Sequence, residues 1–261
     1  MNASAPIARG VAAVPLPPAH ACFFLDVDGT LLDLAARPAE VRMPAGLTGL
    51  LRALGAAAGG AVALVSGRTL ADLDRLLAPL ALAGAGQHGA ERRDAAGRVH
   101  AAAADPDDLE SAARRLRGLA SRYAGLELEH KGLSLALHWR RAPGLGEAAR
   151  AAVLRERAGL GDAWRLQEGK MVCEIVLAGH DKGRAVEAFM SEAPFRGRVP
   201  VFVGDDLTDE AGFAEVNSRG GLSVKVGPGT TQARHVLADA GAVRDWIGAW
   251  LEGRAARGGL P

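Results

Sequence analysis

Short apolar runs that end in polar loops recur along the chain. They are Ala21 to Leu25, Ala61 to Val65, Ala81 to Ala85, Val199 to Val203 and Gly221 to Val226. Segments with the apolar spacing of helices lie between them, at Thr69 to Leu77, Lys182 to Phe189, Leu207 to Val216 and Thr231 to Leu237. Buried strands alternating with helices predict an α/β fold with a parallel sheet covered on both faces. Such sheets bind ligands at the carboxyl ends of their strands.

In the middle of the chain the alternation of strands and helices stops, and the pattern predicts the order helix, hairpin, helix, hairpin. The helix-like segments are Pro106 to Tyr123 and Leu145 to Ala158, and the paired strand-like segments are Leu126 to Lys131 with Leu133 to Arg140, and Ala163 to Glu168 with Met171 to Leu177. Turns are expected at Lys131-Gly132 and Gly169-Lys170. This order is typical of a small α+β unit inserted into the larger fold.

These patterns predict three parts of the chain. Residues 1–19 are expected to be a loose N-terminal tail, residues 20–104 and 181–261 the α/β core, and residues 105–180 the inserted α+β unit. A chain of 261 residues with 49% hydrophobic content is long enough to bury such a core.

The net charge of the chain limits the kind of molecule that it is expected to bind. The 31 basic residues nearly balance the 30 acidic ones, for a net charge of +1, so the clustered positive field of a nucleic-acid-binding protein is not expected. A small molecule is the expected partner. The oligomeric state is left open by the sequence, with a monomer favoured.

Neither a membrane span nor a secretory leader is expected. Four prolines and Arg9 interrupt the apolar positions of the first twenty residues, and later apolar runs are soon broken by Asp, Arg or Gly. We therefore expect a soluble, cytoplasmic protein. Cys22 and Cys173 each lie in an apolar, strand-like run and are expected to be buried free thiols.

The first candidate chemistry is a pair of acids at the end of a predicted strand. Phe23-Phe24-Leu25 runs directly into Asp26-Val27-Asp28-Gly29-Thr30. Asp26 can attack phosphorus, while Asp28 protonates the leaving oxygen and later deprotonates the attacking water. Gly29 allows the backbone to turn tightly beside a phosphate. The alternative is an ordinary turn.

Candidate phosphate-binding groups occur at one further strand end and at one helix start. Ser66 offers a hydroxyl after the run that ends at Val65, and the Gly67-Arg68 turn offers backbone N–H groups. Ser-Gly is also a common helix start. Lys182 begins a predicted helix and can neutralise phosphate and the charge of Asp26; only four of the 31 basic residues are lysines, which favours a specific role.

The segment from Gly204 to Glu210 is densely acidic and follows the strand that ends at Val203. Carboxylate oxygens on a short loop suit Mg²⁺, and Asp205, at the strand end, is the expected ligand. The ion would reduce repulsion between an anionic nucleophile and an anionic phosphate. Asp206 and Asp209 are expected to support this metal site. For Asp209 and Glu210 the alternative is an acidic helix start, where negative charge interacts favourably with the helix dipole.

Taken together, these four motifs resemble those of the haloacid dehalogenase (HAD) superfamily of phosphohydrolases. The resemblance spans about His20 to Trp250 and implies a Rossmann-like parallel-sheet core with an inserted α+β cap. It further implies Asp26 as the nucleophile and Asp28 as acid and base. The implied Mg²⁺ ligands are Asp26, the backbone carbonyl of Asp28, and Asp205.

Finer motifs resemble the trehalose-6-phosphate phosphatase family. They are Gly86 to Glu91, Glu129 to Gly132, Leu137 to Arg140, Gly169 to Glu174 and Gly204 to Glu210. By resemblance, Glu129, Lys131 and Glu174 of the cap hold sugar hydroxyls, and the reaction releases trehalose and inorganic phosphate from trehalose 6-phosphate. His130 departs from the small acid expected at its position.

Each cap residue also has an ordinary interpretation. Glu129 and Lys131 alternate along one strand and can form a solvated face, and Glu174 interrupts an apolar strand, where it needs a partner if buried. His88 follows a strand and a glycine, so it can line the crevice or be structural, and His138 is interpreted as structural.

Two rival functions remain. One is a related phosphatase acting on sucrose phosphate or a mannosyl phosphate. The other is a catalytically silent sugar-phosphate sensor, which the presence of Asp26, Asp28, Lys182 and Asp205 disfavours.

Overall fold

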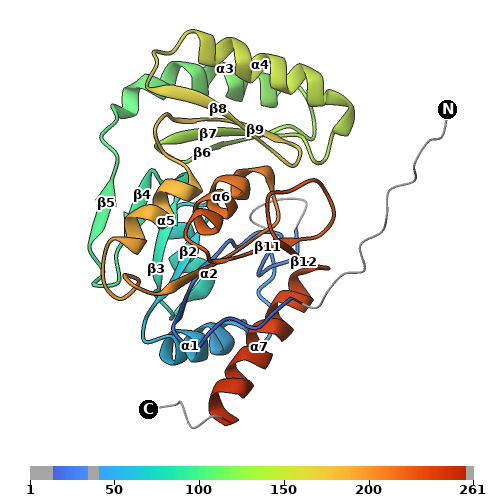
Figure 1. The fold of residues 1–261 in the computed structure, drawn as a ribbon. Coiled ribbons are helices and arrows are strands. Elements are labelled where there is room, and N and C mark those ends of the chain that lie inside the picture. The colour runs from blue at the N-terminus through green and yellow to red at the C-terminus, as the bar shows by residue number, and fades with distance from the viewer. Residues whose placement is uncertain (1–13, 35–40, 257–261) are drawn as a thin grey trace, which may run out of the picture.

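The computed structural model describes residues 14–34 and 41–256 and contains two sheets. An eight-stranded sheet has the order β12-β11-β10-β1-β2-β3-β4-β5, and a four-stranded sheet has the order β6-β7-β9-β8. We call the part built on the first sheet the core and the part built on the second the cap. Figure 1 shows the cap at the top of the view, with α3 and α4 on the side of its sheet that faces away from the core.

The core elements come from both ends of the chain. Its strands are β1 (Ala21–Leu25), β2 (Val62–Val65), β3 (Ala83–Gly86), β4 (Glu91–Arg93), β5 (Val99–Ala101), β10 (Val199–Gly204), β11 (Leu222–Val226) and β12 (His235–Leu237). Its helices are α1 (Leu47–Ala57), α2 (Leu70–Leu77), α5 (Lys182–Met190), α6 (Glu210–Ser218) and α7 (Ala240–Ala256), with 3₁₀ turns η2 (Gln87–Gly89) and η5 (Leu207–Asp209).

Strand β1 lies at the centre of the core and is buried along its whole length. Its alternate side chains serve opposite faces: Phe23 and Leu25 pack with α1 and α7, while Cys22 and Phe24 pack with α5 and α6. All five predicted core strands are present. The core sheet is parallel from β12 to β3, while β4 and β5 pair antiparallel at its edge. This largely parallel α/β core and the second, antiparallel sheet confirm the predicted fold class.

One predicted core helix is wrong. Residues 231–237 form a loop and the short strand β12, which pairs in parallel with β11. The amide of Gln232 donates to Glu210 and that of Arg234 to Ser223, so neither serves an intrahelical bond. Contacts with neighbouring elements thus outweigh a weak local periodicity.

Residues of the predicted loose tail that the structure describes lie against α7. The indole of Trp250 donates to the carbonyl of Pro17 over 2.9 Å, and that of Trp246 donates to the carbonyl of Pro15 over 3.3 Å. Residues 1–13 lie outside the described residues. Within the described ranges, no helix combines the length and apolar character needed to cross a bilayer.

The cap follows the predicted order of elements. It contains η3 (Pro106–Leu109), α3 (Glu110–Ala120), β6 (Glu127–His130), β7 (Ser134–His138), η4 (Pro143–Leu145), α4 (Gly146–Ala158), β8 (Trp164–Gly169) and β9 (Val172–Leu177). Leu135, Leu137, Cys173 and Ile175 pack in one apolar cluster with residues of α3 and α4. Because side chains alternate along strands, the intervening residues of β7 and β9 face the core.

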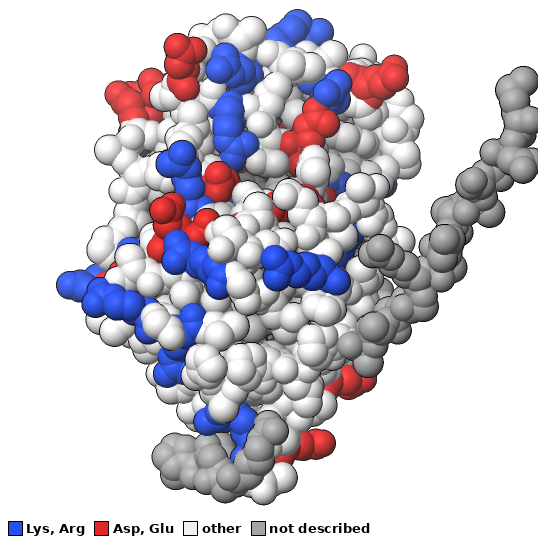
Figure 2. Space-filling model, in the orientation of Figure 1, with Lys and Arg blue, Asp and Glu red and all other residues white. Residues whose placement is uncertain are grey.

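Charge on the drawn face is mixed. Figure 2 shows acidic and basic side chains interspersed over both the cap and the core, without a broad field of one sign in the described part of that face. This distribution agrees with the near-zero net charge of +1.

Candidate active site

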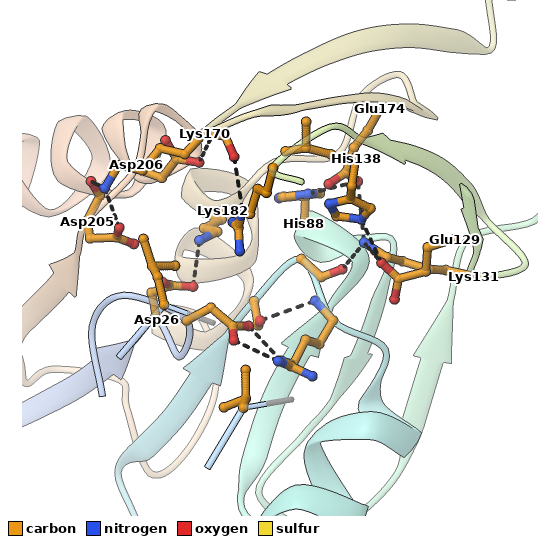
Figure 3. Close-up of a pocket in the computed structure, with 18 residues that line it drawn as sticks. Asp26, His88, Glu129, Lys131, His138, Lys170, Glu174, Lys182, Asp205 and Asp206 are labelled. Atoms are coloured by element: carbon orange, nitrogen blue, oxygen red, sulfur yellow. Dashed lines mark hydrogen bonds and ion pairs between the residues drawn. The ribbon is translucent and has the colours of Figure 1, made fainter. Parts of the chain in front are cut away.

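A pocket lies where the carboxyl ends of the central core strands meet the cap sheet. Figure 3 shows Asp26, Lys182 and Asp205 on one side of it and Glu129, Lys131 and Glu174 on the other. Its lining consists of Asp26, Asp28, Leu34, Val41, Ser66, Gly67, Arg68, His88, Glu129, Lys131, His138, Arg140, Lys170, Val172, Glu174, Lys182, Asp205 and Asp206.

The core side contains three buried carboxylates around one buried ammonium. Asp26 directly follows β1, Asp205 follows β10, and Asp209 ends η5 directly before α6. One carboxylate oxygen from each lies within 4.8 Å of the others. Lys182 Nζ lies 2.8 Å from Asp26 Oδ1 and 2.6 Å from Asp209 Oδ1. The parallel register therefore brings acids that are far apart in sequence to one point.

Burial sets the electrostatics of this cluster. Burial raises the pKa of Asp26 well above its usual range, and Asp209 and Asp205 raise it further, while Lys182 opposes them. The pKa of Lys182 is raised because Asp209 and Asp26 outweigh the effect of burial, which lowers it. Lys182 therefore stays charged beside the candidate nucleophile.

The donor set fits a hard divalent cation. Asp26 and Asp205 offer carboxylate oxygens close together, in the kind of site that Mg²⁺ prefers. Gly29 lets the Asp205 carboxylate lie close to the loop after β1, because its φ is +86° and a Cβ there would lie 2.3 Å from Asp205 Oδ2. Both oxygens of Asp209 are already engaged, one by Lys182 and the other by the amides of Asp205 and Asp206.

Asp209 and Asp206 shape the loop between β10 and α6. Asp206 caps η5, and Asp209 completes the reciprocal capping box. Asp209 also accepts a hydrogen bond from Lys182, so it links this loop to the buried acidic cluster. Its position at a helix start therefore explains only part of its role.

Asp28 is held by an arginine. Arg68 donates to both oxygens of the Asp28 carboxylate, over 2.6 and 2.7 Å. This bidentate pair places the candidate acid and base at the mouth of the pocket, beside the Ser66-Gly67-Arg68 loop. The hydroxyl of Thr30 donates to Asp26 over 3.2 Å.

The predicted phosphate loop lies beside His88. Ser66 is buried and accepts a hydrogen bond from the amide of Arg68. A Cβ at Gly67 would lie 2.8 Å from the His88 ring, so the close approach of that ring requires glycine. His88 is 5% exposed and faces Glu174 Oε2 over 3.4 Å, which connects the core loop to the cap.

Strand register assembles the cap side of the pocket. Ala136 of β7 lies opposite Glu129 of β6 and opposite Glu174 of β9, so both acids flank one small residue on the face toward the core. Lys131 Nζ lies 3.6 Å from Glu129 and 3.5 Å from Glu174. A solvated face is thereby excluded for Lys131, whose side chain is 6% exposed.

The cap groups hold one another in their charged forms. Burial raises the pKa of Glu174, but Lys131 and His88 outweigh it and the net pKa is low. For Glu129, His138 and Lys131 likewise outweigh burial and lower the pKa. The pKa of Lys131 is raised by Glu174 and Glu129 against the effect of burial.

His138 and Lys170 line the pocket, although neither has a predicted role there. His138 was interpreted as structural, yet its Nε2 lies 3.2 Å from Glu129 Oε2 and its ring lines the pocket. Lys170 was interpreted only as a turn residue, yet its Nζ lies 2.5 Å from Asp205 Oδ2. The spacing of His138 from Ala136, on the same strand face, was the available signal for the first. The contact of Lys170 crosses from cap to core and has no local signal.

Comparison with known proteins gives consistent matches. A family model described as trehalose-phosphatase matches residues 24–241. The trehalose-6-phosphate phosphatase of Escherichia coli (strain K12) is 44% identical over 225 residues, covering 86% of this chain and 84% of that protein. A probable trehalose-phosphate phosphatase of Sinorhizobium fredii (strain NBRC 101917 / NGR234) is 46% identical over 209 residues, or 78% and 77% of the two chains.

A solved structure agrees with these matches. The crystal structure of a trehalose-6-phosphate phosphatase related protein has a TM-score of 0.69 and 27% identity, covering 90% of this chain and 99% of that one.

Proposed function

The chain belongs to the trehalose-phosphatase family, and from this premise we propose that it hydrolyses trehalose 6-phosphate to trehalose and inorganic phosphate. The observation that carries the proposal is one pocket with two chemically different sides. Asp26, Asp205 and Lys182 suit an anionic phosphate with a cation, while Glu129, Lys131 and Glu174 suit the many hydroxyls of a disaccharide.

The first step is attack on phosphorus by Asp26. A carboxylate oxygen of Asp26 forms a bond to phosphorus, and the bond from phosphorus to the sugar oxygen breaks. Asp28 gives its proton to that leaving oxygen, so trehalose departs as a neutral alcohol. Lys182, 2.8 Å from Asp26, partly compensates the negative charge that the reacting groups bring together.

The second step releases phosphate. Asp28, now ionised, takes a proton from water as the water oxygen attacks phosphorus, and the bond between phosphorus and Asp26 breaks. Ser66 and the adjacent backbone amides hold phosphate oxygens in both steps. Release of Asp28 from its bidentate pair with Arg68 is required before it can exchange a proton with the substrate.

A divalent cation completes the proposal. Asp26 and Asp205 would hold Mg²⁺, with the backbone carbonyl of Asp28 as a third protein ligand, and the ion would lessen repulsion between the carboxylate and the phosphate. Lys170 contacts the same Asp205 carboxylate, so a bound cation would share this acid with the lysine ammonium.

The cap side supplies sugar recognition. Carboxylates of Glu129 and Glu174 can accept hydrogen bonds from neighbouring hydroxyls, and Lys131 can donate one. A ligand without those hydroxyls would leave buried charged groups poorly satisfied, so it would bind less well. The Nδ1 of buried His88, which has no hydrogen-bond partner among the described residues, offers a further hydroxyl contact.

The decisive assay is phosphate release by the purified protein from trehalose 6-phosphate, sucrose phosphate and a mannosyl phosphate, each with Mg²⁺ and after chelation. We expect strong preference for trehalose 6-phosphate and loss of turnover without the metal. Equal turnover of all three would reject the narrow substrate, and binding without turnover would support the sensor. The names of the relatives favour the trehalose substrate over both rivals. A monomeric, cytoplasmic enzyme stays a prediction.

A further inference from the structure

The turn that follows β3 has an unusual backbone. Gln87 and His88 are consecutive non-glycine residues with φ of 48° and 58°, a conformation that L-residues seldom adopt. Such backbone persists where surrounding contacts determine it, often at functional sites. Here the Gln87 amide donates to the carbonyl of Arg68 and the His88 amide to that of Ser66. The turn is therefore bonded to the proposed phosphate loop.

The side chain of Gln87 reaches from this turn into the cap. Its Oε1 accepts hydrogen bonds from the amide of Leu133 over 3.1 Å and from the hydroxyl of Ser134 over 3.2 Å. Its Nε2 lies 3.3 Å from Glu91 Oε1, which also accepts from the amide of Leu70. Gln87 and Ser134 are 4% and 1% exposed, so water does not compete for these bonds.

The point of contact in the cap is the turn of the hairpin that bears sugar-site residues. Leu133 directly precedes the second strand of this hairpin, Ser134 begins it, and the amide of Lys131 donates to the carbonyl of Ser134 across the turn. Lys131 Nζ also donates to the carbonyl of Gly67 over 2.9 Å. Hydrogen bonds thus run from the phosphate loop through Gln87 to the strand ends that present Glu129 and Lys131.

We propose that Gln87 is a positioning residue that sets the placement of the sugar-binding hairpin relative to the phosphate loop. Gln87 is not itself one of the pocket-lining residues, and its side chain acts by fixing the turn between β6 and β7. The inference rests on the proposed function, because it makes Gln87 a determinant of selectivity for a phosphate attached to a large sugar.

The test replaces Gln87 with methionine, which keeps the length of the side chain but removes both amide bonds. Selectivity is measured as the ratio of kcat/KM for trehalose 6-phosphate to kcat/KM for p-nitrophenyl phosphate, a small ester without sugar hydroxyls to donate to the cap acids. We expect the Gln87→Met ratio to fall about 10- to 100-fold, as misplacement of binding groups by about 1 Å can cost. Amide hydrogen exchange in residues 127–138 should accelerate in parallel.

Two further variants act as controls. Gln232→Met makes the same change at an exposed glutamine of the core and should leave ratio and exchange at wild-type values. Ser134→Ala removes one of the two donors to Gln87 and should move both readouts in the same direction as Gln87→Met, but less. If Gln87→Met does not fold, the selectivity ratio and hydrogen exchange of Ser134→Ala test the proposal, and wild-type values of both would overturn it.

An unchanged ratio and unchanged exchange in folded Gln87→Met would overturn the proposal. Equal loss on both substrates would also overturn it, because the phosphate loop itself would then be damaged. Absence of wild-type turnover on trehalose 6-phosphate would instead reject the proposed function, and hydrogen exchange in the hairpin would still decide whether Gln87 fixes it.

Discussion

The buried acids on the two sides of the pocket differ in the direction of their pKa shifts. On the core side, Lys182 contacts Asp26 and Asp209, yet burial still leaves the pKa of Asp26 raised. On the cap side, Lys131 lies between two carboxylates and the pKa of Glu174 is lowered. At Asp26 burial outweighs the neighbouring lysine, so a bound cation would favour the charged carboxylate, whereas at Glu174 the neighbouring cations outweigh burial and hold the carboxylate charged, ready to accept hydrogen bonds from a neutral sugar.

The two sides also differ in how they are built. On the core side, Asp26, Ser66 and Asp205 each follow a parallel strand in sequence, and Lys182 begins α5. Cap groups stand within antiparallel strands and meet only through register. The comparison predicts that core substitutions impair every phosphate ester, while cap substitutions impair the sugar substrate selectively.

The largest effect is expected from Asp26→Asn. The amide is nearly isosteric but neither anionic nor nucleophilic, so kcat/KM should fall by about 10⁴-fold or more on trehalose 6-phosphate and on p-nitrophenyl phosphate alike. Steady-state assays measure the loss, and circular dichroism checks that the fold is retained. Turnover close to wild type would show that Asp26 is not the nucleophile.

A selective effect is expected from Glu174→Ala. This change removes a buried acceptor for sugar hydroxyls, so kcat/KM for trehalose 6-phosphate should fall by about 100-fold, with a much smaller loss on the artificial ester. The same pair of assays measures both values. Parallel losses on the two substrates would mean that the two sides of the pocket are not separable.

Charge balance on the cap side can be broken with Lys131→Met. Glu174 then lacks its main counter-ion, and the loss of stability should approach about 3 kcal/mol at neutral pH. In the wild type, the pKa of Glu174 is lower in the folded than in the unfolded protein. Ionised Glu174 therefore stabilises the folded state fully at pH values above its unfolded-state pKa, and this stabilisation is lost as the pH falls through its folded-state pKa. In the variant, burial dominates and raises that pKa, so stability is lost as pH rises.

The difference in unfolding free energy between Lys131→Met and wild type should therefore widen from pH 4 to pH 7. Urea titrations at several pH values measure it. A gap that stays constant over this range would mean that Lys131 does not hold Glu174 ionised.

The smallest effect concerns Lys170, the cap residue that contacts the core acids. Because its ammonium shares Asp205 with the expected cation, Lys170→Gln should tighten Mg²⁺ binding by roughly 3- to 10-fold, since each 1.4 kcal/mol corresponds to tenfold. Calorimetric titration of the substrate-free protein measures this directly. Weaker Mg²⁺ binding in the variant would indicate that Lys170 supports the cation site and does not compete for it.

The difference between the two sides also explains what the sequence could predict. Asp26, Ser66 and Asp205 follow apolar runs, so local pattern and sheet geometry place them together. His138 and Lys170 were missed as pocket residues because one acts across a hairpin and the other across two parts of the molecule.

Tertiary contacts decided the remaining differences. Residues 231–237 carry a weak helical spacing, yet side chains of Glu210 and Ser223 take their amides and β11 pairs with the end of the segment. Asp209 reads as a helix-start acid, and only the fold reveals its contact with Lys182. Such partners lie beyond the reach of local periodicity.

The most direct test of the account is the stereochemical course at phosphorus, followed with a substrate whose phosphoryl group is made chiral by sulfur and oxygen isotopes. Attack by Asp26 followed by attack of water inverts the configuration twice, so the account predicts net retention. Net inversion would show a single direct attack by water and would contradict a covalent intermediate on Asp26.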